Sequence, residues 1–152
     1  MTEGFRMQFE QGPYVQMAGI CEQVIEDKTG VLSLIRIIDT ITHTVEGPDA
    51  PIEMPPVTYP MKMVIMLKSG RARGRHELKI VPHLPSGETK APLVRSVQME
   101  GEERGFNNII NMLFTFTMEG LYWFNVYLDE SLLTRIPLKI KYNRIVTQET
   151  SH

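Results

Sequence analysis

A cluster of cationic side chains separated by glycines is the strongest candidate for chemistry in this sequence. Its members all fall within residues 68–76 and are Lys68, Arg71, Arg73, Arg75 and His76. Guanidinium groups bind phosphate oxygens through paired hydrogen bonds, and Gly70 and Gly74 would let backbone amides approach a bound anion. The segment therefore predicts a site for phosphate, a nucleotide or a nucleic-acid backbone.

Two other interpretations of residues 68–76 remain open, and we favour the first of them. The segment lacks the Lys-Ser/Thr ending of a phosphate-binding P-loop and has no aromatic side chain to stack a base. It can therefore be a hairpin loop whose charges keep an edge strand soluble. It can also be a charged pairing surface that meets an acidic partner, or the acidic residues 100–103 of a second copy.

Metal-ligating and nucleophilic residues are sparse in the sequence. None of the four histidines (His43, His76, His83 and His152) lies near Cys21 or near another histidine. Metal sites need such ligands at set spacings, so we predict neither a metal site nor a cofactor. Cys21 lies in an apolar strand, where a thiol is inert, and no Gly-x-Ser-x-Gly motif is present.

One carboxylate, that of Asp39, lies amid apolar residues of a long segment rich in β-branched side chains. Such a group can act as a general base, and a site assembled from distant strands around Asp39 and His76 would make the protein an enzyme. We prefer to interpret Asp39 as a bulge residue or as the partner of Arg36. We therefore predict that the protein is not an enzyme.

The composition is that of an ordinary globular domain. The chain has 152 residues, of which 42% are hydrophobic and 22% charged, and a formal net charge of −2, so it does not attract nucleic acid or anionic membranes as a whole. A single cysteine fits a reducing compartment. Because residues 1–13 lack the apolar block of a signal peptide and no run is long enough for a membrane helix, we predict a cytoplasmic protein without a membrane partner.

Short segments with alternating apolar and polar residues predict about eight strands. These segments are residues 14–25, 31–45, 61–68, 75–81, 93–99, 106–118, 121–128 and 132–142. Alternation slips at residues 36–39, which predicts a bulge or a handover between sheets. The five prolines of residues 46–60 predict a surface crossing, since proline donates no backbone hydrogen bond. Residues 106–112 fit either a helix or a strand.

This pattern predicts an all-β fold, a two-layer antiparallel β-sandwich that is immunoglobulin-like or similar, with a closed barrel as the alternative. We place the domain at residues 14–142, between an N-terminal extension at 1–13 and a C-terminal tail at 143–152. Gly120 and Tyr122 resemble the corner of immunoglobulin-like sandwiches, in which the phenol bonds back to a loop backbone. Met63 and Met66 point to opposite faces of their strand, which predicts that both faces are covered.

Several segments taken together resemble a bacterial family of small β-rich domains of unknown function. The resemblance spans about residues 14–142 and rests on residues 20–23, 30–36, 68–76, 100–105, 120–124 and 133–138. It implies a bacterial or phage-related setting, and it carries over no activity and no functional residue.

The sequence therefore favours a non-catalytic interaction or structural module of a bacterial or phage-related assembly. Its expected partner is another protein or further copies of the same chain. The alternative is a binder of nucleic acid, nucleotide or phosphate through residues 68–76.

Overall fold

Residues 11–148 are described by the computed structural model, and within them the chain forms seven strands and no helix. The strands are β1 (Tyr14–Glu26), β2 (Leu32–Ile37), β3 (Thr40–Glu46), β4 (Val57–His83), β5 (Leu93–Phe116), β6 (Gly120–Leu128) and β7 (Ser131–Ile145). None of the described residues belongs to a helix that could cross a membrane. The all-β prediction is confirmed.

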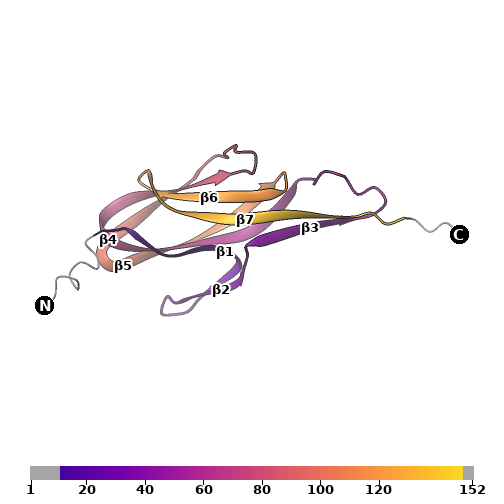
Figure 1. Cartoon of the computed structure of the whole chain (residues 1–152). Helices are drawn as coiled ribbons and strands as arrows, with labels where there is room; N and C mark the ends of the chain where they lie inside the picture. The colour runs from indigo at the N-terminus through magenta and orange to yellow at the C-terminus, as the bar shows by residue number, and fades with distance from the viewer. Residues whose placement is uncertain (1–10, 149–152) are drawn as a thin grey trace.

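The strands pair in the order β2-β1-β4-β6-β7-β3, and β5 pairs with β4 from outside this path. Every pairing is antiparallel except that of β3 with β7, which is parallel. Figure 1 shows β6 and β7 lying over β1 and the neighbouring part of β4, so the strands form the two layers of a β-sandwich.

The long strands β4 and β5 contribute to both layers. In the first layer, β4 pairs with β1 from Tyr14↔Lys68 to Cys21↔Lys62. In the second layer, it pairs with β6 from Leu78↔Leu128 onward. Strand β5 follows β4 through both layers, and the pairing register shifts between Lys68 and Arg73, where the strands bend. The bend, defined here as residues 69–74 of β4 and 100–104 of β5, therefore joins the two layers.

The core lies between the inner faces of the two layers. Its largest fully buried side chains include Met63 and Ile65 of β4, and Tyr122 and Phe124 of β6. Because side chains on a strand alternate between faces, the apolar residues at every second position supply this core. The packing of aromatic rings around Phe116 and Tyr122, whose centroids lie 5.0 Å apart, closes one end of it.

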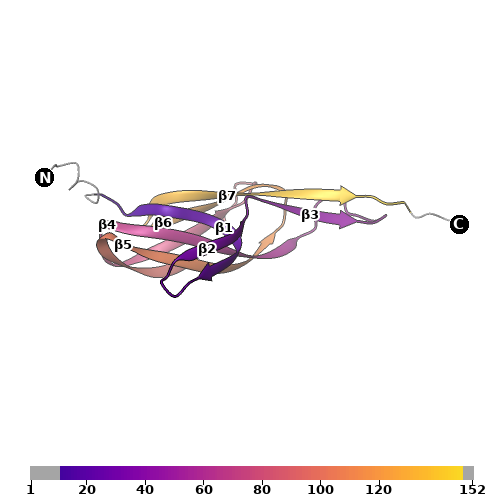
Figure 2. The same ribbon diagram turned by 90° about the horizontal axis from the view of Figure 1, so that it is seen from below.

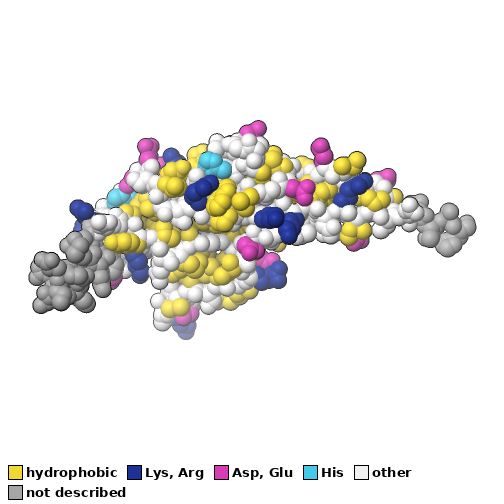
Figure 3. All heavy atoms as spheres, viewed as in Figure 1, with side chains coloured by type: hydrophobic (Ala, Val, Ile, Leu, Met, Phe, Trp, Pro, Cys, Tyr) yellow, Lys and Arg dark blue, Asp and Glu magenta, His cyan; other side chains and the backbone are white. Residues whose placement is uncertain are grey.

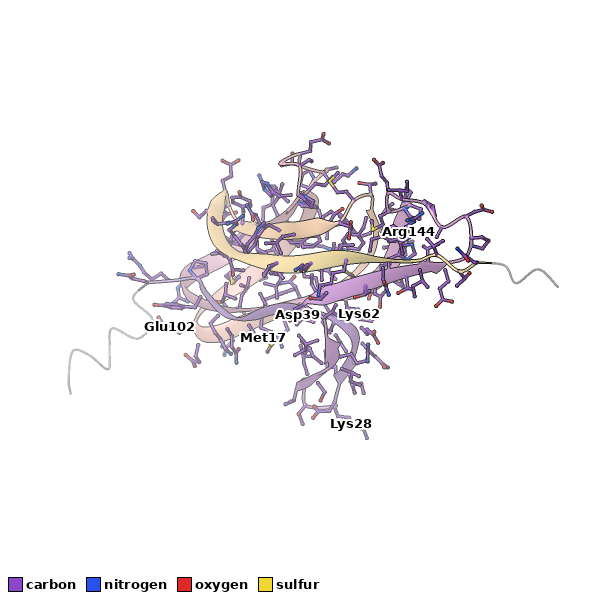
Figure 4. The ribbon with its side chains drawn as sticks, turned by 45° about the vertical axis from the view of Figure 1, so that its right-hand side comes forward. Met17, Lys28, Asp39, Lys62, Glu102 and Arg144 are labelled. Atoms are coloured by element: carbon purple, nitrogen blue, oxygen red, sulfur yellow. The ribbon has the colours of Figure 1, made fainter. Side chains whose placement is uncertain are left out.

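The handover predicted at residues 36–39 is confirmed. Strand β2 pairs with β1 in the first layer, whereas β3 pairs with β7 in the second, and Arg36 near the end of β2 has a φ of 56°. The tip of the β1–β2 hairpin, marked by Lys28 in Figure 4, projects away from the sandwich. Figure 3 shows hydrophobic side chains on this projection, where Val31 and Ile37 are exposed.

The opposite end of the molecule is a two-stranded parallel ribbon of β3 and β7, which Figure 2 shows running out towards the C-terminus. Strand β7 continues to Ile145, beyond the start of the predicted tail at residue 143. The connection before β4 is held by Tyr142, which donates to the Pro51 carbonyl at 2.6 Å, and by Arg144, which donates to the Ala50 carbonyl at 2.8 Å.

The structure has seven strands where the sequence predicts about eight, since the segment boundaries differ. Residues 31–45 divide into β2 and β3, whereas residues 61–68 and 75–81 are one strand, as are residues 93–99 and 106–118 up to Phe116. Residues 106–112 are strand, because each of them pairs with β4.

Candidate functional site

The basic segment lies in the bend of β4, so the predicted hairpin loop at residues 68–76 is wrong. Gly70 and Gly74 have φ values of 57° and 83°, in the left-handed region that glycine adopts at little cost. They let β4 change direction while it stays paired with β5, through Gly70↔Glu102 and Gly74↔Met99. A glycine-rich charged segment therefore serves here as a bend within a strand.

Within the bend, basic and acidic side chains of the same chain meet. The guanidinium of Arg73 donates to the Glu100 carbonyl at 3.0 Å and forms an ion pair with Glu102 at 3.3 Å. Arg104 pairs with Glu100 at 2.8 Å. The acidic residues 100–103, considered above as a contact for the basic segment of a second copy, thus lie beside the basic segment of their own chain. Glu102 marks this place in Figure 4.

His76 is held between two acceptors. Its Nδ1 contacts the Asp129 carboxylate, and its Nε2 lies 2.8 Å from the carbonyl oxygen of Arg73. The hydrogen bond to Asp129 raises the pKa of His76 above its ordinary value. Hydrogen bonds from the Glu77 amide and from His76 hold the pKa of Asp129 below its ordinary value. The arrangement suits a protonated imidazole that ties β4 to the β6–β7 turn.

The five predicted anion-binding residues differ in whether they bind groups of their own chain. Arg73 and His76 are engaged with their own chain. Lys68, Arg71 and Arg75 form no ion pair with residues 11–148, and Arg71 and Arg75 are exposed. These three are the cations of the segment that an anion could reach.

Asp39 and His76, the pair considered for catalysis, line different hollows. Asp39 borders a hollow of about 370 Å³ with Glu22 and Tyr59, whereas His76 borders one of about 330 Å³ with Asp129. The predicted pairing of Asp39 with Arg36 is wrong, because Arg36 forms its ion pair with Glu22 at 2.9 Å. Within residues 11–148, no three histidine, cysteine or acidic side chains gather in a way that could hold a metal ion.

The first layer carries an apolar outer face, on the side away from the core. Met66 lies half-buried on this face and Met63 is fully buried in the core, so the prediction that they point apart is confirmed. The cross-strand rows of the outer face are Met17–Met66–Asn107, Gly19–Val64–Ile109 and Cys21–Lys62–Asn111. Lys62 is the one charged residue of these rows, and it donates to the Asn111 side chain at 2.7 Å.

Cys21 and Val64 are fully buried although they lie on this outer face. Burial raises the pKa of the Cys21 thiol, as expected for a thiol in an apolar strand. Gly19, between them, has a backbone that any residue can adopt, and a Cβ atom added there meets nothing within 4 Å. The face is thus largely apolar, with space above the backbone of Gly19.

Strand β5 forms the rim of this face. Among residues 11–148 it pairs with β4 alone, so its other side is an open edge in both layers. Residues 105–118 contain no charged side chain, and Leu113 is 74% exposed. Sequence reasoning missed this edge, and the absence of charge over residues 105–118 is the signal that could have revealed it.

Comparison with known proteins identifies a family. Residues 16–141 match the model of a family described as "Family of unknown function (DUF6941)". The chain belongs to this family. No curated protein matches the chain.

Two solved structures are similar to this chain at low sequence identity. An immunoglobulin-like protein from Pseudomonas aeruginosa is 14% identical with a TM-score of 0.42, over 87% of this chain and 98% of that one. The CARDB domain of a Pyrococcus furiosus protein, solved in complex with di-metal ions, is 10% identical with a TM-score of 0.39, over 89% of this chain and 96% of that one.

Proposed function

We propose that this protein is a non-catalytic β-sandwich interaction module, and that the open edge of β5 takes an extended strand of a protein partner. The observation that carries the proposal is that residues 105–116 of this edge carry no charge, since natural edge strands use charged side chains to prevent association. An added strand would satisfy the open backbone groups of β5, and the exposed side chains beside them would select the partner.

Within the described residues 11–148, reactive groups do not gather at one place, which supports a non-catalytic role. Asp39 is exposed and lies in a hollow without His76, and His76 is committed to Asp129 and the Arg73 carbonyl. The family resemblance supports a bacterial or phage-related assembly as the setting, which the genes that flank this one would test.

A photo-crosslinking amino acid placed at single positions in the native host tests the proposed docking edge. Position 113 lies on the open edge, and position 109 lies beside it on the outer face. We expect crosslinks from both positions to one protein that mass spectrometry identifies. Leu121 of β6 is the matched control, because it is exposed and apolar but lies in the other layer. Equal crosslinking from position 121, or none from positions 109 and 113, would contradict the proposal.

A further inference from the structure

The open edge of β5 is long and regular on its first-layer side. Residues 105–116 pair without interruption with residues 57–68 of β4. In an antiparallel ladder, alternate residues direct their N–H and C=O groups to opposite sides. Every second residue of this stretch therefore presents a donor and an acceptor away from β4, in position for another strand.

On the first-layer side of β5, the devices that normally protect such an edge are confined to the adjoining bend. Glu102 and Glu103 lie there, and Glu102 has a φ of 55° that distorts the strand. Beyond Gly105 the strand is regular and uncharged, with Ile109 and Leu113 exposed at 37% and 74%. The sequence thus restricts association at the bend and leaves residues 105–116 open to it.

A buried polar group on the same stretch lacks a partner. Asn108 is 6% exposed, and its Nδ2 has no hydrogen-bond acceptor among the described residues. Leaving such a donor unsatisfied destabilises a protein, so native structures supply partners for nearly all of them. Asn108 pairs with the core residue Ile65, so its side chain lies on the inner face of the sheet, and the proposal below rests on the backbone edge and its lack of charge instead.

We propose that the occupant of this edge is the β5 strand of a second copy, paired antiparallel about a two-fold axis. This inference rests on the proposed function and names its partner. A two-fold interface requires a surface that complements itself. If the axis lies anywhere from Ile109 to Asn111, residues 105–113 face only uncharged residues of the other copy. Neither like charges nor unpaired charges then oppose the pairing, as they would across the bend.

The pairing also extends the apolar outer face. The rows that contain Val64 and Met66 end at Ile109 and Asn107 of β5. Across the axis, each row would continue into the outer face of the second copy, since paired strands in one sheet share their faces. Two first layers would then form one sheet, and an axis at Asn111 would place Ile109 of each copy directly opposite Leu113 of the other.

Sedimentation of the full chain over a concentration series tests this pairing. We expect the wild type to reach the mass of a dimer. Lysine or glutamate at position 109 would bring like charges together near the axis, so Ile109→Lys and Ile109→Glu should each weaken the dimer at least about tenfold. An equimolar mixture of the two variants should regain the dimer, because opposite charges then meet. Leu121→Lys should leave the dimer unchanged.

Circular dichroism and thermal unfolding establish that each variant is folded before its mass is interpreted. A monomeric wild type at every concentration up to about 1 mM would overturn the self-pairing. So would variants at position 109 that dimerise like the wild type, or a mixture that does not recover. If the wild type is monomeric while positions 109 and 113 crosslink to a different protein, the self-pairing fails and the proposed function stands. If neither occurs, both fail.

Discussion

The phenol of Tyr122 donates a hydrogen bond to the Met118 carbonyl at 2.8 Å, and the same oxygen accepts one from the Met118 amide at 3.2 Å. One hydroxyl therefore satisfies both backbone groups of Met118. Tyr122 itself is 1% exposed, so its ring also fills the core. This is the corner that the spacing of Gly120 and Tyr122 predicts. It fixes the short connection from β5 to β6 and thereby the end of the open edge.

Replacing Tyr122 with phenylalanine should destabilise the fold. The ring still fills the core, but the Met118 amide and carbonyl lose their partner, which costs about 1–3 kcal/mol of unfolding free energy. Urea unfolding followed by circular dichroism measures the change. Tyr127→Phe, on the same strand with no hydrogen bond from its hydroxyl in the described residues, should change it by less than about 0.5 kcal/mol. Equal effects would show that the corner contributes nothing.

The contact between His76 and Asp129 should make stability depend on pH. The pKa of His76 is raised on folding, so its contribution is fully present below the unfolded pKa of about 6.5 and is lost as the pH rises through the folded value. The pKa of Asp129 is lowered, so its contribution is present above about 3.9 and is lost as the pH falls through the folded value.

His76→Gln should therefore reduce the unfolding free energy most between about pH 4 and pH 6.5, and less at pH 9. The magnitude is modest, because the Asp129 side chain is 51% exposed and solvent screens the pair. Urea midpoints measured across this range for the wild type and the variant give the difference. His43→Gln, which lies on β3 away from the bend, is the control. A difference that is constant with pH would show that only packing is lost.

The β6–β7 turn holds Glu130 in a left-handed backbone conformation that is unfavourable for residues other than glycine. Asp129 and Glu130 have φ values of 48° and 71°, as a two-residue hairpin turn requires. Asp129 is used by His76 and the Glu77 amide, whereas the Glu130 side chain has no contact of that kind among the described residues. Glu130→Gly should raise the unfolding free energy by about 1 kcal/mol, because glycine adopts this φ without steric cost.

Thermal unfolding measures the effect of Glu130→Gly. Lys28→Gly, in the turn of the β1–β2 hairpin where φ is not positive, should leave the melting temperature unchanged or lower it. A decrease for Glu130→Gly would mean that its side chain has a stabilising role that outweighs the backbone strain.

Local alternation predicts the strands whose two faces differ clearly. Strand β7 and the break at residues 36–39 follow from apolar and polar residues that occupy opposite faces of one short segment. The Tyr122 corner follows from a spacing within one turn. In each case, the information lies in residues close together in the sequence.

The bend and the open edge depend on pairings between distant residues, which local patterns do not encode. Glycines and charges at residues 68–76 suit a turn as well as a bend, and only the facing residues 99–105 keep the strand continuous. The same holds for residues 106–112, whose helical spacing is overridden by pairing with β4, and for the parallel pairing of β3 with β7. The candidate interface consists of such residues, so the sequence indicated an interaction module without locating its surface.

The bend should be the least tolerant part of β4 to a single added methyl group. Gly70 has a φ of 57°, and a Cβ atom there would overlap the Gln11 carbonyl, which accepts a hydrogen bond from the Arg71 amide at 3.1 Å. Gly70→Ala should therefore lower the unfolding free energy by at least about 2 kcal/mol. Gly19→Ala is the matched control, because its φ is ordinary and its Cβ would meet nothing within 4 Å. It should be neutral or stabilising, since alanine restricts the unfolded chain. If Gly70→Ala were as stable as Gly19→Ala in urea, the backbone conformation of Gly70 would not be needed for the bend.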